Sequence, residues 1–157
     1  PAVLGRGGRA YPPARPTVGR MDCATFFDLL DERLGDRHHE PSRTTVGDQC
    51  VVEFYHPRVV ERLGTGSLVT RFNRSGVVWA PLADHLKVKL RVTDPHRDAV
   101  VEALDRAPFA FAETDHRVVG APDGEMVTVL HYSMSTDGVS RAEVEATLDA
   151  VGAALAV

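Results

Sequence analysis

The stretch LKVKLRV, residues 86–92, decides the fold class of this chain. Its four apolar side chains fall on one face of a strand and its three basic side chains on the other. This alternation predicts a strand in a sheet that is covered on one side and solvated on the other. A helix is predicted directly after it, because Asp94 is suited to cap the helix, Pro95 to its first turn and Pro108 to its end.

Two further helices follow from capping residues and apolar periodicity. The first covers residues 22–34, with Asp22 as N-cap and Gly35 as the stop. The last begins at Ser140, which forms an S-x-x-E capping box with Glu143. Val139 and Val144 occupy the positions of a hydrophobic staple around it.

The other segments are predicted from β-branched and aromatic runs between turn residues. Residues 35–48 are expected to be a polar connection, and PRVVERLG (57–64) is compatible with one or two helical turns. A PDG turn within 121–125 predicts a hairpin. Strands are expected at residues 49–56, 67–72, 77–82, 109–120 and 126–134.

Together these elements predict an α+β fold in the order α-β-β-β-α-β-β-α. Short turns between neighbouring strands require antiparallel pairing, because parallel pairs need long crossovers. We expect a single antiparallel β-sheet of about five strands with helices packed on one face.

The chain has 157 residues, a length that suits one domain. Residues 1–20 hold four prolines and four glycines, so we expect a disordered or extended tail before a single domain at 21–157. The tail carries four arginines and no acid, which leaves a net charge of −8 on residues 21–157 out of −4 for the whole chain. An acidic body disfavours general nucleic-acid binding, and no apolar run is long enough for a membrane span.

A cytoplasmic location is the default expectation, because no apolar segment of a secretory signal follows the basic tail. Cys23 and Cys50 are then expected to be reduced thiols that pack as small hydrophobic residues.

The histidines do not indicate a metal site. His38 and His39 lie in a polar segment without preset geometry, and the E-x-x-H spacing of Glu53 and His56 places them on opposite faces of a strand. The sequence therefore predicts no metal, no cofactor and no assigned catalytic residue.

Two groups of residues are candidates for binding. The basic row on 86–92 would meet an acidic partner or phosphates, although a solvated outer face is the commoner role of such a row. Aromatic residues of the early strands are candidates for core or dimer contacts. The candidate binding residues are Trp79, Phe72, Tyr55, Lys87, Lys89 and Arg91.

The order of elements resembles the bacterial type III secretion chaperone fold, which YbjN-like sensory regulators are thought to share. The resemblance covers about residues 22–155. Its carriers are LKVKLRV with helix PHRDAVVEALDRAPF, the strand pair closing at DGEMVTVLHYSMSTDG, and the helix SRAEVEATLDAVGAAL. It implies a homodimer that offers sheet and helix surfaces to an extended client segment, without catalysis.

The leading hypothesis is thus a non-enzymatic, chaperone-like or regulatory protein-binding module, whose partner is a protein client or a second copy. One alternative is a small enzyme or small-molecule binder with a pocket between sheet and helices, for which His131, Tyr132 and Ser133 are the candidate residues. A second alternative is a toxin–antitoxin or immunity-type inhibitor.

Overall fold

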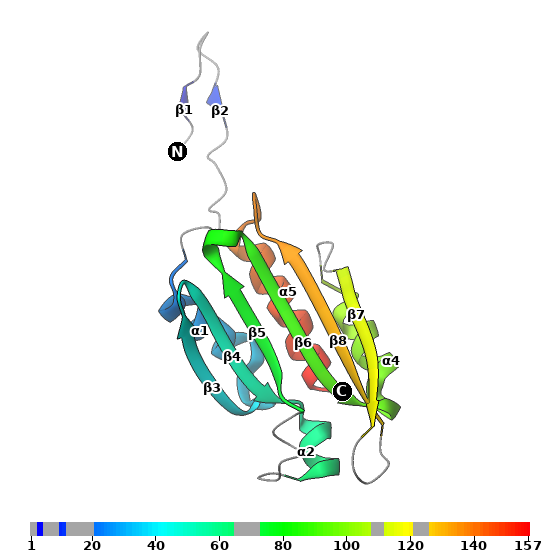
Figure 1. Ribbon diagram of the computed structural model, residues 1–157. Coiled ribbons are helices and arrows are strands. Elements are labelled where there is room, and N and C mark those ends of the chain that lie inside the picture. The colour runs from blue at the N-terminus through cyan, green and yellow to red at the C-terminus, as the bar shows by residue number, and fades with distance from the viewer. Residues whose placement is uncertain (1–2, 5–9, 12–20, 65–72, 108–111, 121–125) are drawn as a thin grey trace.

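The computed structural model describes residues 3–4, 10–11, 21–64, 73–107, 112–120 and 126–157 (Figure 1). In its main body the helices are α1 (Cys23–Leu34), α2 (Pro57–Leu63), α4 (Arg97–Leu104) and α5 (Arg141–Leu155). The strands are β3 (His39–Val46), β4 (Gln49–Tyr55), β5 (Ser75–Ala80), β6 (His85–Thr93), β7 (Ala112–Gly120) and β8 (Met126–Ser135). Short 3₁₀ turns occupy Gly35–Arg37, Pro81–Ala83 and Asp94–His96. Near the N-terminus, β1 (Val3–Leu4) pairs antiparallel with β2 (Ala10–Tyr11).

The predicted fold class is confirmed. One antiparallel sheet has the strand order β3-β4-β5-β6-β8-β7, and α1, α4 and α5 lie together against one of its faces (Figure 1). Among the described residues six strands form this sheet, where the sequence predicted about five. None of the described helices is long and apolar enough to cross a membrane.

The alternation of β6 places its side chains as predicted. Leu86, Val88, Leu90 and Val92 are all 0–1% exposed, whereas Lys87 is exposed. The apolar face of β6 packs into one core with the corresponding faces of β4, β5 and β8 and with the apolar stripes of α1, α4 and α5. In α1 the fully buried aromatic ring is Phe26, and Phe27 is half-buried at the edge of this core.

The prediction of a polar connection at residues 35–48 is wrong, because residues 39–46 form the edge strand β3. Seven of its eight residues are exposed, so the segment lacks the alternation from which a strand is recognised. Backbone pairing with β4 holds it in the sheet, and the register shifts between His39 and Ser42. Pro41 falls within this shift, where the missing N–H costs no ladder bond.

The predicted N-caps are confirmed for α1 and α5 but not for α4, and the predicted end of α4 at Pro108 lies outside the described residues. Asp22 accepts a hydrogen bond from the backbone N–H of Thr25, and Ser140 and Glu143 form both bonds of the capping box. Asp94 instead opens a 3₁₀ turn and accepts a hydrogen bond from the Thr128 hydroxyl at 3.3 Å. α4 therefore begins three residues later, at Arg97, without a side-chain cap.

The segment that the sequence left ambiguous at 57–64 is the helix α2, with Pro57 in its first turn and Gly64 at its end. The predicted hairpin is confirmed by the antiparallel pairing of β7 with β8. Its PDG turn at 121–125 and the strand predicted at 67–72 lie outside the described residues.

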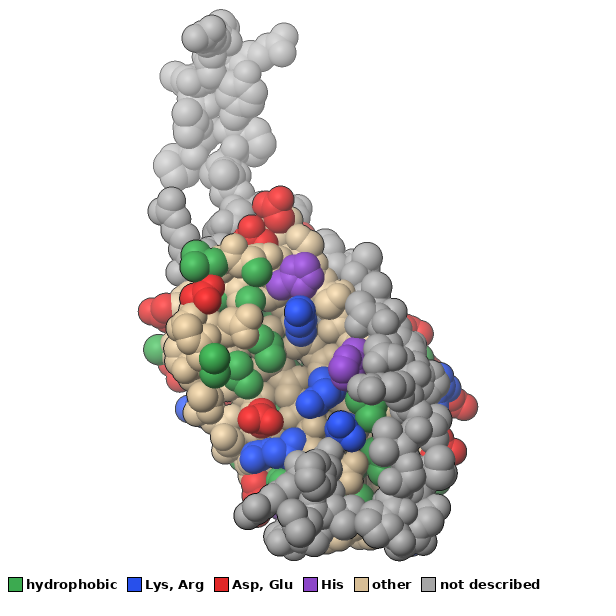
Figure 2. Space-filling model, viewed as in Figure 1, with side chains coloured by type: hydrophobic (Ala, Val, Ile, Leu, Met, Phe, Trp, Pro, Cys, Tyr) green, Lys and Arg blue, Asp and Glu red, His purple; other side chains and the backbone are tan. Residues whose placement is uncertain are grey.

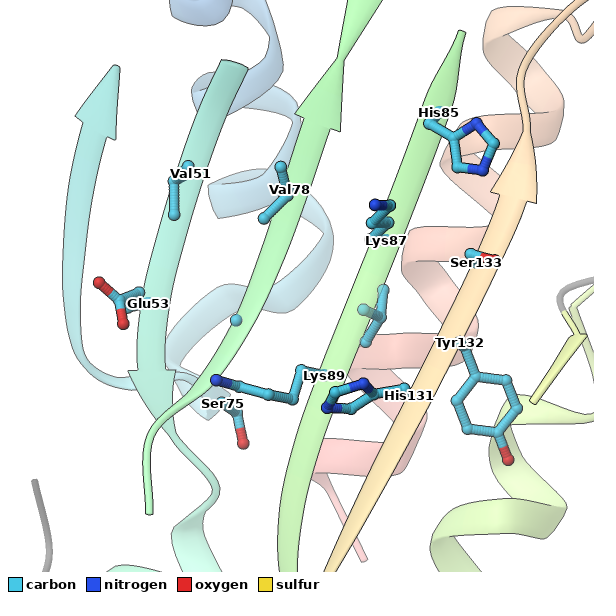
Figure 3. Close-up of a pocket in the computed structure, with 12 residues that line it drawn as sticks. Val51, Glu53, Ser75, Val78, His85, Lys87, Lys89, His131, Tyr132 and Ser133 are labelled. Carbon is cyan, nitrogen blue, oxygen red and sulfur yellow. The ribbon is translucent and has the colours of Figure 1, made fainter. Parts of the chain in front are cut away.

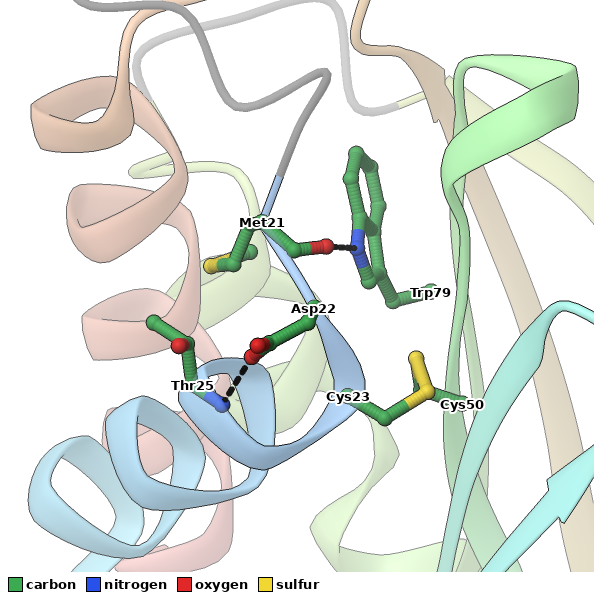
Figure 4. Close-up of a disulfide and its surroundings, with 6 residues drawn as sticks. All are labelled: Met21, Asp22, Cys23, Thr25, Cys50 and Trp79. Atoms are coloured by element: carbon green, nitrogen blue, oxygen red, sulfur yellow. Dashed lines mark hydrogen bonds between the residues drawn. A yellow bond between two sulfur atoms is a disulfide. The ribbon is translucent and has the colours of Figure 1, made fainter.

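The prediction of reduced thiols is wrong, because Cys23 and Cys50 form a disulfide with their Cα atoms 5.3 Å apart (Figure 4). The bond joins the first residue of α1 to β4, so helix and sheet are linked covalently at one end of the core. Trp79 lies opposite Cys50 on β5, and its indole N–H donates to the Met21 carbonyl at 3.2 Å. Sequence spacing did not reveal the pair, since a separation of 27 positions along the chain does not say how close the two residues lie in space.

Candidate functional site

The face of the sheet opposite α1, α4 and α5 carries the candidate site, which we call the open-face groove. Its volume is 520 Å³, and it crosses β4, β5, β6 and β8. Figure 2 shows basic side chains along the middle of this face, with hydrophobic side chains beside them. The groove is lined by Val51, Glu53, Ser75, Gly76, Val78, His85, Lys87, Val88, Lys89, His131, Tyr132 and Ser133.

Strand register arranges eight of these residues in two rows across the sheet. Directly opposed residues of antiparallel strands lie side by side on one face. The first row runs Val51, Val78, Lys87, Ser133 from β4 to β8. The second row runs Glu53, Gly76, Lys89, His131 over the same four strands.

Gly76 accounts for the hollow in the second row. It has no side chain to fill the space between Glu53 and Lys89, and a Cβ at this position would lie 3.2 Å from the Val52 carbonyl oxygen. The Lys89 side chain extends from β6 over β5 into this space (Figure 3). The shape of the groove therefore depends on the close approach of the β4 and β5 backbones at Gly76.

The two lysines of the groove differ in their surroundings. Lys87 is exposed, whereas Lys89 is half-buried. Burial lowers the pKa of the Lys89 amine from its ordinary value, and the nearby charge of Arg91 lowers it further, while Glu53 opposes both effects. Neither lysine forms an ion pair with a side chain of residues 21–64, 73–107 or 127–157.

The structure separates the six candidate binding residues. Lys87 and Lys89 line the groove, and Arg91 is half-buried further along β6, opposite Val129. Trp79 is 0% exposed in the core, which makes it a core residue and not a contact surface.

Tyr55 is not among the described residues that line the groove. Tyr55 is 6% exposed, with the Arg74 guanidinium 5.0 Å from its ring centre. Phe72 lies outside the described residues.

The candidate residues of the enzyme alternative are also divided. His131 and Ser133 share the groove side of β8, as their spacing predicts, whereas Tyr132 is 2% exposed and belongs to the core cluster. His38 is buried, with Nε2 3.3 Å from an Asp31 carboxylate oxygen, while His39 is exposed. Among the residues described, no group of three or more His, Cys, Asp or Glu is placed to hold a metal ion.

The arrangement is suited to holding a ligand by charge and contact. Two amines supply donors for an anion, and Ser133 and the imidazoles of His85 and His131 add polar groups. Val51 and Val78 supply apolar contact beside them.

Sequence reasoning missed the other described members of the site, which are Val51, Glu53, Ser75, Gly76, Val78, His85 and Val88. A signal was present on β4, since Val51 and Glu53 alternate with Cys50, Val52 and Phe54 and so belong to the opposite face. The hollow at Gly76 depends on strand register, which the sequence does not specify.

Comparison of the chain with protein-family models, with curated proteins and with solved structures found no match. The resemblance to type III secretion chaperones thus stays a prediction, and the geometry of the site carries the functional argument.

Proposed function

We propose that the chain is a non-enzymatic protein-binding module, chaperone-like or regulatory, that holds an extended segment of a client protein in the open-face groove. The observation that carries this proposal is the groove itself, 520 Å³ of hollow surface on the face of the sheet opposite the helices.

The composition of the groove supports a peptide ligand. A solvated sheet face is ordinarily polar, yet half-buried Val51 and Val78 lie side by side on this one. Extended peptides place successive side chains on opposite sides, so a strand-like segment presents one set of side chains to a flat sheet and leaves the other in water. Extended segments are recurring ligands of β-sheet proteins at sheet edges, and here the apolar contacts lie on the face.

An array of random twelve-residue peptides tests the proposal. We expect labelled protein to bind a subset of the array, and Val78→Asp to lose that subset because it places a charge on the apolar side of the groove. Leu82→Asp is the matched control, since Leu82 is 83% exposed outside the groove. The near-ultraviolet spectrum of Trp79 checks that each variant is folded. Absence of binding, or equal binding by both variants, would contradict the proposal.

We further propose that the working unit is a homodimer, as the resemblance implies. Sedimentation equilibrium at micromolar concentration is then expected to give twice the chain mass of 17.1 kDa. A single species at the chain mass would remove the dimer from the proposal and leave the groove unaffected.

A second candidate function is the binding of a small molecule. The groove volume lies within the ~300–1,000 Å³ that is usual for such sites. Binding of small carboxylates by the wild-type protein, together with a blank peptide array, would favour this candidate over a protein client.

A further inference from the structure

The lysine content of the chain singles out the open-face groove. Against sixteen arginines the sequence has only two lysines, Lys87 and Lys89, and both line the groove. They lie two residues apart on β6, so their side chains share one face. Neither amine forms an ion pair with a side chain of residues 21–64, 73–107 or 127–157.

We propose that the lysine pair receives acidic side chains, and that the segment held in the groove is an extended one with Glu or Asp at alternate positions. This inference rests on the proposed function and names the chemistry of its client. The complementarity is one of charge, because Glu53 is the only acid among the groove residues that the structure describes, against two lysines.

Spacing supports the same ligand. Residues two apart on a strand are separated by about 6.7 Å, and the same separation holds for alternate residues of an extended peptide. A segment that runs along β6 therefore brings successive acidic side chains to Lys87 and then to Lys89. On β8, Ser133 lies opposite Lys87 and His131 lies opposite Lys89. A peptide carboxylate at either lysine would therefore have one of these polar side chains beside it.

Partial burial makes a carboxylate the favourable partner. The half-buried Lys89 amine has lost part of its hydration, and the charge of Arg91 acts against its protonated form. A carboxylate in the groove offsets both effects, since an opposite charge stabilises the protonated amine. Charge-assisted hydrogen bonds of this kind are stronger than neutral ones.

Other occupants fit the charges less well. The tail at residues 1–20 contributes four arginines and no acid, so it has the same sign as the lysine pair. A second copy that docked the same face would set lysines against lysines. A nucleic-acid strand longer than the groove would place phosphates over a body of net charge −8, which repels them. Its sugar-phosphate backbone would also make no apolar contact with Val51 and Val78.

The test uses a labelled decapeptide in which glutamate alternates with serine. Control peptides replace glutamate by glutamine, or keep the composition with the five glutamates contiguous. We expect the alternating acidic peptide to bind the wild-type protein about tenfold more tightly than either control. We expect the double variant Lys87→Gln/Lys89→Gln to lose that advantage, while Arg106→Gln, which removes one exposed charge two residues after the end of α4, keeps it.

Chemical modification of the folded wild-type protein provides a second test that needs no refolding. Acetylation removes the charges of both lysines and should abolish the preference, whereas reductive dimethylation keeps the charges and should preserve it. Because Lys87 and Lys89 carry the only side-chain amines, carbodiimide coupling of the acidic peptide to a lysine should be found at these two positions.

The outcomes separate this inference from the proposed function. Peptide-array binding without any preference for the alternating acidic peptide would overturn the inference and leave the proposed function standing. Equal binding by the double variant would also overturn it. A ten-nucleotide single-stranded DNA that binds more tightly than the acidic peptide and displaces it would identify a nucleic acid as the occupant and overturn both.

Discussion

His56 is a buried histidine whose two ring nitrogens both have partners. It is 0% exposed at the N-cap of α2, where Nδ1 accepts a hydrogen bond from the Arg58 backbone N–H at 3.1 Å. Nε2 lies 2.9 Å from the Ala154 carbonyl oxygen and donates to it. Only the neutral ring with its proton on Nε2 satisfies both contacts, because a protonated Nδ1 would face another donor. One side chain thus joins α2 to the end of α5.

The titration of His56 predicts a loss of stability in acid. Its pKa is lowered from 6.5 to about 4, chiefly by burial and also by the charges of His96 and Arg58, while the hydrogen bond to the Ala154 carbonyl acts in the opposite direction. Between pH 6.5 and pH 4 the unfolded chain therefore binds a proton that the folded chain does not. The stability of the folded state that depends on a neutral His56 is therefore fully present above pH 6.5. About 3 kcal/mol of the free energy of unfolding is lost as the pH falls to 4.

Urea unfolding at several pH values measures this effect. His56→Asn is the matched variant, because Asn is a good N-cap that does not titrate. We expect the difference in unfolding free energy between wild type and variant to shrink as the pH falls from 6.5 to 4. A difference that stays constant over this range would show that His56 does not titrate as its surroundings require.

At the scale of elements, the sequence specifies those segments whose own residues determine their structure. The strand β6 and the capping box of α5 are of this kind, since alternation and local hydrogen bonds are visible in a short window. The edge strand β3 is held by pairing with β4 and has no buried face, so its residues give no signal. The Asp94 carboxylate accepts a hydrogen bond from Thr128, which is 34 positions away in the sequence, and does not form the predicted helix cap.

The candidate site divides in the same way. Lys87 and Lys89 follow from alternation on one strand and were predicted as binding residues. Their neighbours Val78 and Gly76 come from another strand and meet them through sheet register. A shift of one residue in register would turn every side chain of β5 to the other face, so the groove depends on a long-range property of the fold.

At the scale of the whole molecule, the disulfide bears on where the protein folds. Disulfides persist in oxidising compartments and are rare in the cytosol. The expectation of a cytoplasmic location rested on the absence of a secretory pattern after the basic tail, and the Cys23–Cys50 bond argues against it. The location stays a prediction, and the state of the two thiols in the native protein is the measurement that bears on it.

The disulfide also predicts how the whole molecule responds to reductant. A cross-link between residues 27 apart removes loop-closure entropy from the unfolded chain, which corresponds to about 3–4 kcal/mol of stability. Trp79 is the only tryptophan of the chain and lies opposite Cys50, so its fluorescence reports on unfolding of the region around the disulfide. We expect reductant to lower the urea midpoint of the wild-type protein, and Cys23→Ser/Cys50→Ser to start at the lower midpoint and not respond to reductant. Equal midpoints for the oxidised and reduced wild-type protein, or two thiols titratable in the native protein without reductant, would show that helix α1 is held against the sheet by packing alone.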